Sequence, residues 1–185
     1  MFRNLDEITF PIETKLLFPV VQRENIKSGK FIPERFALVA HRPEDGKILE
    51  PEELNELRYA KKYFNSIESE LKSRKGLLIN VNISKGMYWG LMGVGKYSFS
   101  PYKIIWLTAG ETKLNPKLIG SFEEKQWQAN QSLQAFMPFE SKSEAEQKLK
   151  ELKELATDMD SELLGTPGTL GWGQPGRFSN ILRFK

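Results

Sequence analysis

Lys103-Ile104-Ile105-Trp106-Leu107-Thr108 is the clearest β-strand of this chain and the stretch from which its fold is best worked out. Four large apolar residues stand in a row, and β-branched and aromatic side chains favour extended backbone. Upstream, glycines within residues 86–95 predict a loop or hairpin, preceded by a strand from Leu77 to Ile83. Downstream, a polar connection over residues 109–130 leads to a short strand from Leu133 to Pro138.

Two helices flank this central region. The first is predicted to start after Pro51, to carry apolar residues every three or four positions, and to stop at Gly76. The second is predicted over residues 141–157, because Ser141 and Glu144 form a capping-box pattern ahead of a leucine stripe.

Before the first helix, residues 14–21 and 36–40 are expected to be strands, with a turn-rich connection over residues 25–30. These elements predict a chain with both helices and strands (α/β in the broad sense), of the α+β class, with small mixed sheets and two main helices. One domain is expected over residues 1–164, followed by a Gly/Pro-rich tail over residues 165–185.

Composition narrows the possible functions. The 185 residues are 39% hydrophobic and 28% charged, the balance of a soluble globular protein. No apolar run approaches the roughly 20 residues that span a bilayer, and the N-terminus lacks a signal-peptide core, so a cytoplasmic protein with no membrane partner is expected. The chain has no cysteine and one histidine, His41, in a predicted polar turn where a catalytic role is not expected.

Charge is concentrated in one region. Residues Lys72 to Lys117 hold eight Lys and Arg and a single acid, Glu111, whereas the remaining residues hold 19 basic and 23 acidic side chains. Aromatic residues and glycines alternate with these cations. This pattern suits a polyanion with flat bases, so nucleic acid is the first partner to consider. The competing interpretation is that the aromatics are core residues and the lysines are merely solvated.

The candidate contacts fall into three groups. Long cationic side chains at predicted turns or element ends are assigned to phosphates: Arg23, Lys27, Lys30, Arg74, Lys75 and Lys85. Side chains that can bond two atoms of a base are candidate readers: Arg23, Asn80, Asn82, Gln126, Gln128, Asn130 and Gln131. Side chains expected to project from the glycine-containing segment are Tyr88, Trp89, Lys96 and Tyr97. Phe99 and Trp106 are expected to pack inside, and Trp127 is expected to be an anchor.

Several segments resemble a known family in their order along the chain. They are Leu17-Phe18-Pro19-Val20-Val21-Gln22-Arg23-Glu24-Asn25-Ile26-Lys27, Phe36-Ala37-Leu38-Val39, Pro51-Glu52-Glu53-Leu54, Tyr63-Phe64-Asn65-Ser66-Ile67-Glu68-Ser69-Glu70-Leu71-Lys72-Ser73-Arg74, Tyr97-Ser98-Phe99-Ser100-Pro101-Tyr102-Lys103-Ile104-Ile105-Trp106 and Phe136-Met137-Pro138-Phe139-Glu140-Ser141-Lys142-Ser143-Glu144-Ala145-Glu146. Together they resemble the target-recognition domain of adenine-specific DNA methyltransferases of restriction-modification systems, the TaqI-like specificity domain.

The resemblance covers residues 14–155 but not the catalytic half of such enzymes. Asn115-Pro116-Lys117 lacks the second proline and the aromatic residue of an Asn-Pro-Pro-Tyr motif, and Gly93-Val94-Gly95 does not follow a strand and open a long helix. The resemblance therefore implies a non-catalytic module that binds double-stranded DNA beside a methyltransferase or restriction catalytic domain or subunit. No cofactor is expected in this chain; AdoMet, and Mg²⁺ where the partner also cleaves DNA, would bind that separate part.

Two other functions stay open. A small Mg²⁺-dependent nuclease would need one acid, then a second acid followed closely by a lysine. Only the second part of this pattern, the acid with its lysine, is matched by Asp45-Gly46-Lys47 and Glu111-Thr112-Lys113. A protein-interaction subunit would instead dock a partner through exposed aromatics and the leucine stripe of residues 141–157. Protein docking and DNA binding would differ in salt dependence, because phosphate contacts weaken steeply as salt rises.

Overall fold

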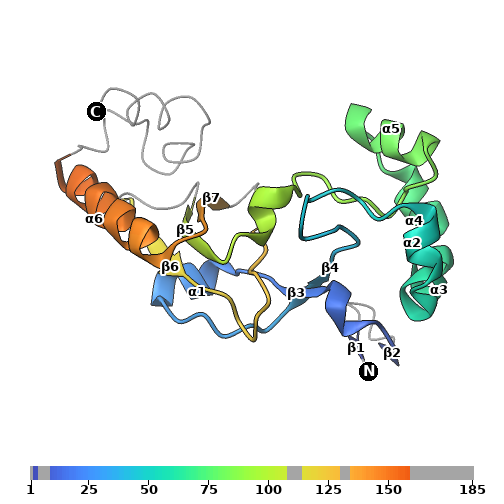
Figure 1. Ribbon diagram of the computed structural model, residues 1–185, viewed down its shortest axis with the longest axis horizontal. Helices are drawn as coiled ribbons and strands as arrows, with labels where there is room; N and C mark the ends of the chain where they lie inside the picture. Colours follow the sequence, from blue (N-terminus) through green and yellow to red (C-terminus); the bar gives the residue numbers. More distant parts are fainter. Residues whose placement is uncertain (1, 4–8, 108–113, 130–133, 159–185) are drawn as a thin grey trace. The chain divides into compact units, whose positions relative to one another are not determined.

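The chain forms two compact units, each built from two separate stretches of sequence. The computed structural model describes residues 2–3, 9–107, 114–129 and 134–158 (Figure 1). Unit 1 comprises Met1–Phe18 and Phe36–Phe99, and unit 2 comprises Pro19–Arg35 and Ser100–Lys185. The chain thus passes from one unit to the other three times. Helices and small sheets occur together, which confirms the α+β class.

Unit 1 is mainly helical. Its short extended and 3-10 segments are β1 (Phe2–Arg3), β2 (Thr9–Phe10), η1 (Thr14–Leu16), β3 (Leu17–Pro19, its last residue in unit 2), β4 (Phe36–Leu38) and η2 (Lys96–Phe99). Its helices are α2 (Pro51–Asn55), α3 (Arg58–Ser66), α4 (Glu68–Ser73) and α5 (Leu77–Ser84). Strand β1 pairs with β2, and β3 with β4.

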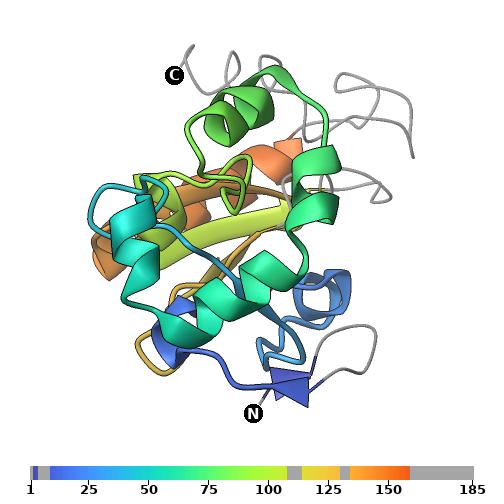
Figure 2. The ribbon, with the colours of Figure 1, turned by 90° about the vertical axis from the view of Figure 1, so that its right-hand side faces the viewer.

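The helix predicted after Pro51 is present but divided into three. Figure 2 shows α2, α3 and α4 as consecutive teal-to-green segments with changes of direction between them. Leu57 and Ile67 leave helical backbone geometry at the two breaks. The Glu13 carboxylate accepts hydrogen bonds from the backbone N–H groups of Tyr59 and Ala60, at 2.9 and 2.8 Å, and so satisfies the first turn of α3. A residue distant in sequence therefore favours the start of a new helix there.

The predicted strand from Leu77 to Ile83 is wrong, because these residues form helix α5. A continuous apolar run has no period that separates a strand from a helix. The predicted burial of the helical stripe is confirmed, since Leu54, Leu57 and Phe64 are buried in the main core of unit 1.

Unit 2 contains a three-stranded antiparallel sheet with the strand order β6-β5-β7. Its elements are α1 (Arg23–Ser28), β5 (Tyr102–Leu107), β6 (Lys117–Ile119), β7 (Gln134–Phe139) and α6 (Lys142–Asp158). In the central strand, Ile104 pairs with Leu118 on one side and Met137 on the other. The strands predicted around Lys103–Thr108 and Leu133–Pro138, and the helix predicted over residues 141–157, are confirmed to within a few residues.

Strand β5 is apolar from Ile104 to Leu107 because both faces of the sheet are covered. Ile104 and Trp106 pack with Leu152 of α6, which lies along the sheet (Figure 1). Side chains facing the opposite way form a second cluster: Ile105 and Leu107 with Val21, Ile26, Ile119 and Trp127. The predictions that Trp106 and Phe99 are buried and that Trp127 is an anchor are confirmed.

Candidate nucleic-acid interface

Four cationic side chains gather around helix α1 in unit 2. Arg23 and Lys27 are exposed and lie four residues apart, on one side of the helix, and exposed Lys30 follows its end. Strand β6 begins with Lys117, whose Cε lies 4.0 Å from the position that a Cβ on Gly29 would occupy. We call Arg23, Lys27, Lys30 and Lys117 the α1 cationic surface.

A buried amide holds the loop that carries Lys30. Asn25 Oδ1 accepts the backbone N–H of Gln22 at 2.8 Å, and Asn25 Nδ2 donates to the carbonyls of Lys30 and Ile32 at 2.9 and 3.3 Å. Gly29 ends the helix with φ of 72°, a left-handed conformation that a glycine adopts at little cost. The backbone around these cations is therefore fixed before any ligand binds, which lowers the entropy cost of binding.

The α1 cationic surface unites three residues that the sequence predicted as phosphate contacts with one that it did not. Lys117 closes the cationic stretch, but it lay in a segment predicted to be a polar connection, so no pattern connected it with Lys30. Only the antiparallel pairing of β6 with β5 explains its position. Within residues 19–35 the acids are Glu24 and Glu34, against four Lys and Arg.

Not every cation of the stretch from Lys72 to Lys117 is available to a ligand. Lys72 is paired with Glu68 at 2.5 Å, and Lys103 is buried. Lys75, Lys85 and Lys96 are exposed, as predicted, and no described residue forms an ion pair with them. These three lysines belong to unit 1, so they remain separate candidates for phosphate contact rather than members of the α1 cationic surface.

The Arg74 guanidinium is engaged inside unit 1. Its Nε donates to the Leu71 carbonyl at 2.9 Å, and its two terminal nitrogens donate to the carbonyls of Gly90 and Tyr88. Burial also lowers the pKa of Arg74. A guanidinium that ties the end of α4 to the loop after α5 is not available for a phosphate, so the expectation for Arg74 is corrected.

Tyr88 and Trp89 do not project from the glycine-containing segment. They are 7% and 5% exposed within the unit 1 core. The Trp89 indole N–H donates to the Leu49 carbonyl, and the Tyr88 hydroxyl donates to Asn65 Oδ1, both at 2.9 Å. Buried rings cannot stack on bases, so Tyr88 and Trp89 are not candidate DNA contacts. The Tyr88 hydroxyl and the Trp89 N–H have hydrogen-bond partners inside the core, so burial of these side chains costs little.

The rest of this segment is held against the turn of residues 42–47. Leu91 donates its N–H to His41 Nε2 at 3.0 Å, and His41 Nδ1 lies 2.9 Å from the Gly46 carbonyl. Nε2 accepts, so Nδ1 must carry the proton, and burial lowers the pKa of this neutral imidazole. His41 is therefore a buried structural residue rather than part of a polar turn.

Gly46 is packed against the same segment. A Cβ at Gly46 would lie 2.0 Å from the Lys96 nitrogen, so the two backbones touch. Of the predicted projecting residues, Lys96 and Tyr97 are exposed, and the Tyr97 hydroxyl donates to the Gly93 carbonyl at 2.7 Å.

The predicted base readers are mostly not exposed in loops. Gln128 is buried and its Nε2 donates to the Gln126 carbonyl at 3.2 Å, so it is withdrawn. Gln126 is half-buried and donates to the Glu124 carbonyl at 3.0 Å. Asn80 and Asn82 lie on helix α5, where Asn80 is exposed. Asn130 and Gln131 lie outside the described residues.

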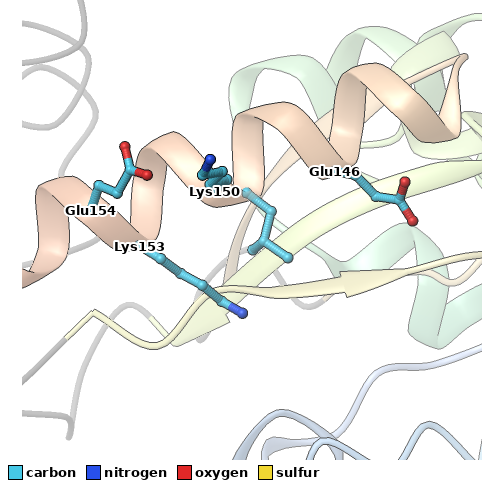
Figure 3. A pocket seen from close by; sticks show the side chains of 5 residues that line it. Glu146, Lys150, Lys153 and Glu154 are labelled. Carbon is cyan, nitrogen blue, oxygen red and sulfur yellow. The ribbon is translucent and has the colours of Figure 1, made fainter.

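A shallow hollow of about 370 Å³ lies beside α6, lined by Glu146, Leu149, Lys150, Lys153 and Glu154. Figure 3 shows Lys153 and Glu154 leaving the helix in different directions. Two lysines and two glutamates cancel in charge, so this hollow has no preference for an anion. In the described ranges, no three His, Cys, Asp or Glu side chains are grouped to hold a metal ion. Nor is any described helix long and apolar enough to cross a membrane.

Comparison with protein-family models, with curated proteins and with solved structures gives no match.

Proposed function

We propose that this chain is a sequence-specific recognition module for double-stranded DNA that serves a separate methyltransferase or restriction catalytic domain in the cytoplasm. The observation that carries DNA binding is the α1 cationic surface on a backbone fixed by Asn25. Cations at fixed spacing suit phosphates, which set the register of a protein on a duplex. The assignment to an adenine-specific DNA methyltransferase rests on the resemblance in segment order.

The DNA arm is tested by fluorescence polarisation with a pool of random duplexes at several salt concentrations. We expect the Lys30→Ala/Lys117→Ala variant to bind DNA more weakly. The slope of log K against log salt concentration should become less steep by about 2, because each phosphate contact contributes about 0.9 to it. The matched control is Lys61→Ala/Lys62→Ala, which removes the same charge from exposed positions of α3. Equal slopes for the two double variants would contradict the assignment of the α1 cationic surface.

Sequence choice is tested separately, by selecting bound duplexes from the pool and sequencing them. An enriched motif supports a specificity module. Salt-sensitive binding without enrichment would contradict target recognition while leaving general DNA binding intact.

A protein-interaction function is the second candidate, although not through the expected leucine stripe. Leu152 of α6 is fully buried, and Leu149 packs against the sheet of unit 2. An apolar surface with more exposure lies on α5. For the nuclease alternative, Asp45 pairs with Arg42 and Lys47, and Glu111-Thr112-Lys113 lies outside the described residues, so no described residue favours it.

A further inference from the structure

Helix α5 exposes an apolar face on unit 1. Leu77 and Leu78 are 81% and 60% exposed, and Val81, three or four residues further on, is 42% exposed. Positions three and four apart lie on one side of a helix, so the three side chains form a single patch. Such a patch differs from scattered exposed apolar residues, which are normal on protein surfaces.

The opposite side of α5 is attached to its own unit. Ile83 packs against the main core of unit 1, and this core also contains Met87, which follows the helix. Aliphatic residues therefore occur on both sides of the helix. An apolar side of a helix is normally covered in a folded protein, but the described residues cover only the Ile83 side of α5.

The two lysines beside the patch indicate the charge of its partner. Lys75 precedes α5 and Lys85 follows it, both are exposed, and residues 71–110 contain no Asp or Glu. Two copies of α5 packed face to face would bring lysines together in either orientation, with no acid on α5 itself to offset them. A surface that is apolar in the middle and cationic at both ends complements one that is apolar and acidic.

We infer that the α5 patch, Leu77, Leu78 and Val81 flanked by Lys75 and Lys85, docks an amphipathic acidic helix of a partner protein. The apolar side of the partner covers the three aliphatic side chains, and its carboxylates lie near the two lysines. The α5 patch shares no residue with the α1 cationic surface, but Lys75 and Lys85 are also candidates for phosphate contact, so duplex DNA is included below as a competitor.

The test uses the full chain and three fluorescein-labelled synthetic helices. One carries leucines on one face and glutamates on the other; the second has lysines in place of the glutamates; the third has glutamines in place of the leucines. We expect the first to bind at least about tenfold more tightly than either of the others. The Leu77→Gln/Leu78→Gln variant should lose that affinity, because glutamine keeps helix propensity but not the apolar surface.

The matched control is Ile32→Gln, which removes an exposed aliphatic side chain from unit 2 and should leave binding unchanged. Circular dichroism and thermal melting show whether each variant is folded. If the leucine variant does not fold, Lys75→Glu/Lys85→Glu keeps the proposal testable, because it should reverse the preference toward the lysine helix.

Three results would overturn the inference. The first is equal binding of the acidic and basic helices. The second is a dimer in sedimentation that Leu77→Gln/Leu78→Gln dissociates, which would identify a second copy as the occupant. The third is duplex DNA that displaces the acidic helix and itself depends on Leu77 and Leu78, which would assign α5 to DNA.

Discussion

Lys103 is a cationic residue in an environment that lysine side chains usually avoid. It is 2% exposed in the middle strand of the unit 2 sheet, where its Nζ donates to the Ser100 carbonyl at 2.9 Å and lies 5.9 Å from the centre of the Phe136 ring. Burial lowers the pKa of Lys103 to about 8, although nearby Glu140 acts in the opposite direction. The folded state therefore holds a cation in a poorly solvated place at neutral pH.

We expect Lys103→Met to stabilise the protein at pH 7 by about 1–3 kcal/mol, because an apolar side chain of similar length removes the buried charge. The folded state loses the Lys103 proton near pH 8, whereas the unfolded chain keeps it until about pH 10.4. Between these values the unfolded state binds more protons, so the stability of the parent chain rises with pH. The advantage of the variant should shrink over that window in urea unfolding.

A suitable control is Lys47→Met, since the Lys47 side chain is 72% exposed. It should change stability little at any pH. If Lys103→Met raises the free energy of unfolding by the same amount from pH 7 to pH 10, deprotonation of Lys103 is not the cause of the stabilisation.

At the scale of elements, the turn between Phe122 and Lys125 carries backbone strain. The two residues exchange backbone hydrogen bonds of 2.8 Å, and the residues between them, Glu123 and Glu124, have φ of 45° and 63°. This is the geometry of a two-residue turn that favours Asn and Gly, because a side chain in left-handed backbone costs about 1–2 kcal/mol.

We expect Glu124→Gly to stabilise unit 2 by about 1 kcal/mol, since glycine adopts this conformation without the steric cost of a Cβ. Thermal melting of the variant should show the gain. The same substitution at Glu44, an exposed residue without positive φ, should be neutral or destabilising. A gain at both positions would point to removal of charge rather than relief of backbone strain.

Elements also show what the sequence could predict. Strand β5 and helix α6 were found because each has a long, consistent pattern of apolar residues. Helix α5 was missed because Leu77-Leu78-Ile79 has no period, and the breaks around α3 were missed because Glu13 supplies its cap from 46 residues away. Among the candidate contacts, the exposure of Lys75, Lys85 and Lys96 agrees with the sequence, whereas the burial of Tyr88 and Trp89 was not predicted, because their partners come from elsewhere in unit 1.

At the scale of the whole molecule, the three passages of the chain between the units make each unit depend on both of its stretches. Residues 100–185 supply the sheet of unit 2, but residues 19–35 supply α1, whose Ile26 packs against Ile105. Without α1, one face of the sheet would lose its cover.

We therefore expect residues 100–185 alone to lack a fixed core, and residues 19–35 joined to them by a Gly/Ser linker to fold. Amide hydrogen exchange should show protected β5 amides only in the joined chain. Protection of those amides in residues 100–185 alone would contradict the requirement for α1.

The same discontinuity sets an order of events on the ribosome. Residues 19–35 emerge early, but the strand that α1 packs against follows only after the 64 residues from Phe36 to Phe99 have been made. Unit 1 can close as soon as its last residue leaves the exit tunnel, whereas Val21 and Ile26 must wait with their apolar side chains uncovered. A nascent chain stalled just after residue 99 has left the tunnel should therefore contain a folded unit 1, while the apolar side of α1 is still uncovered and open to chaperones.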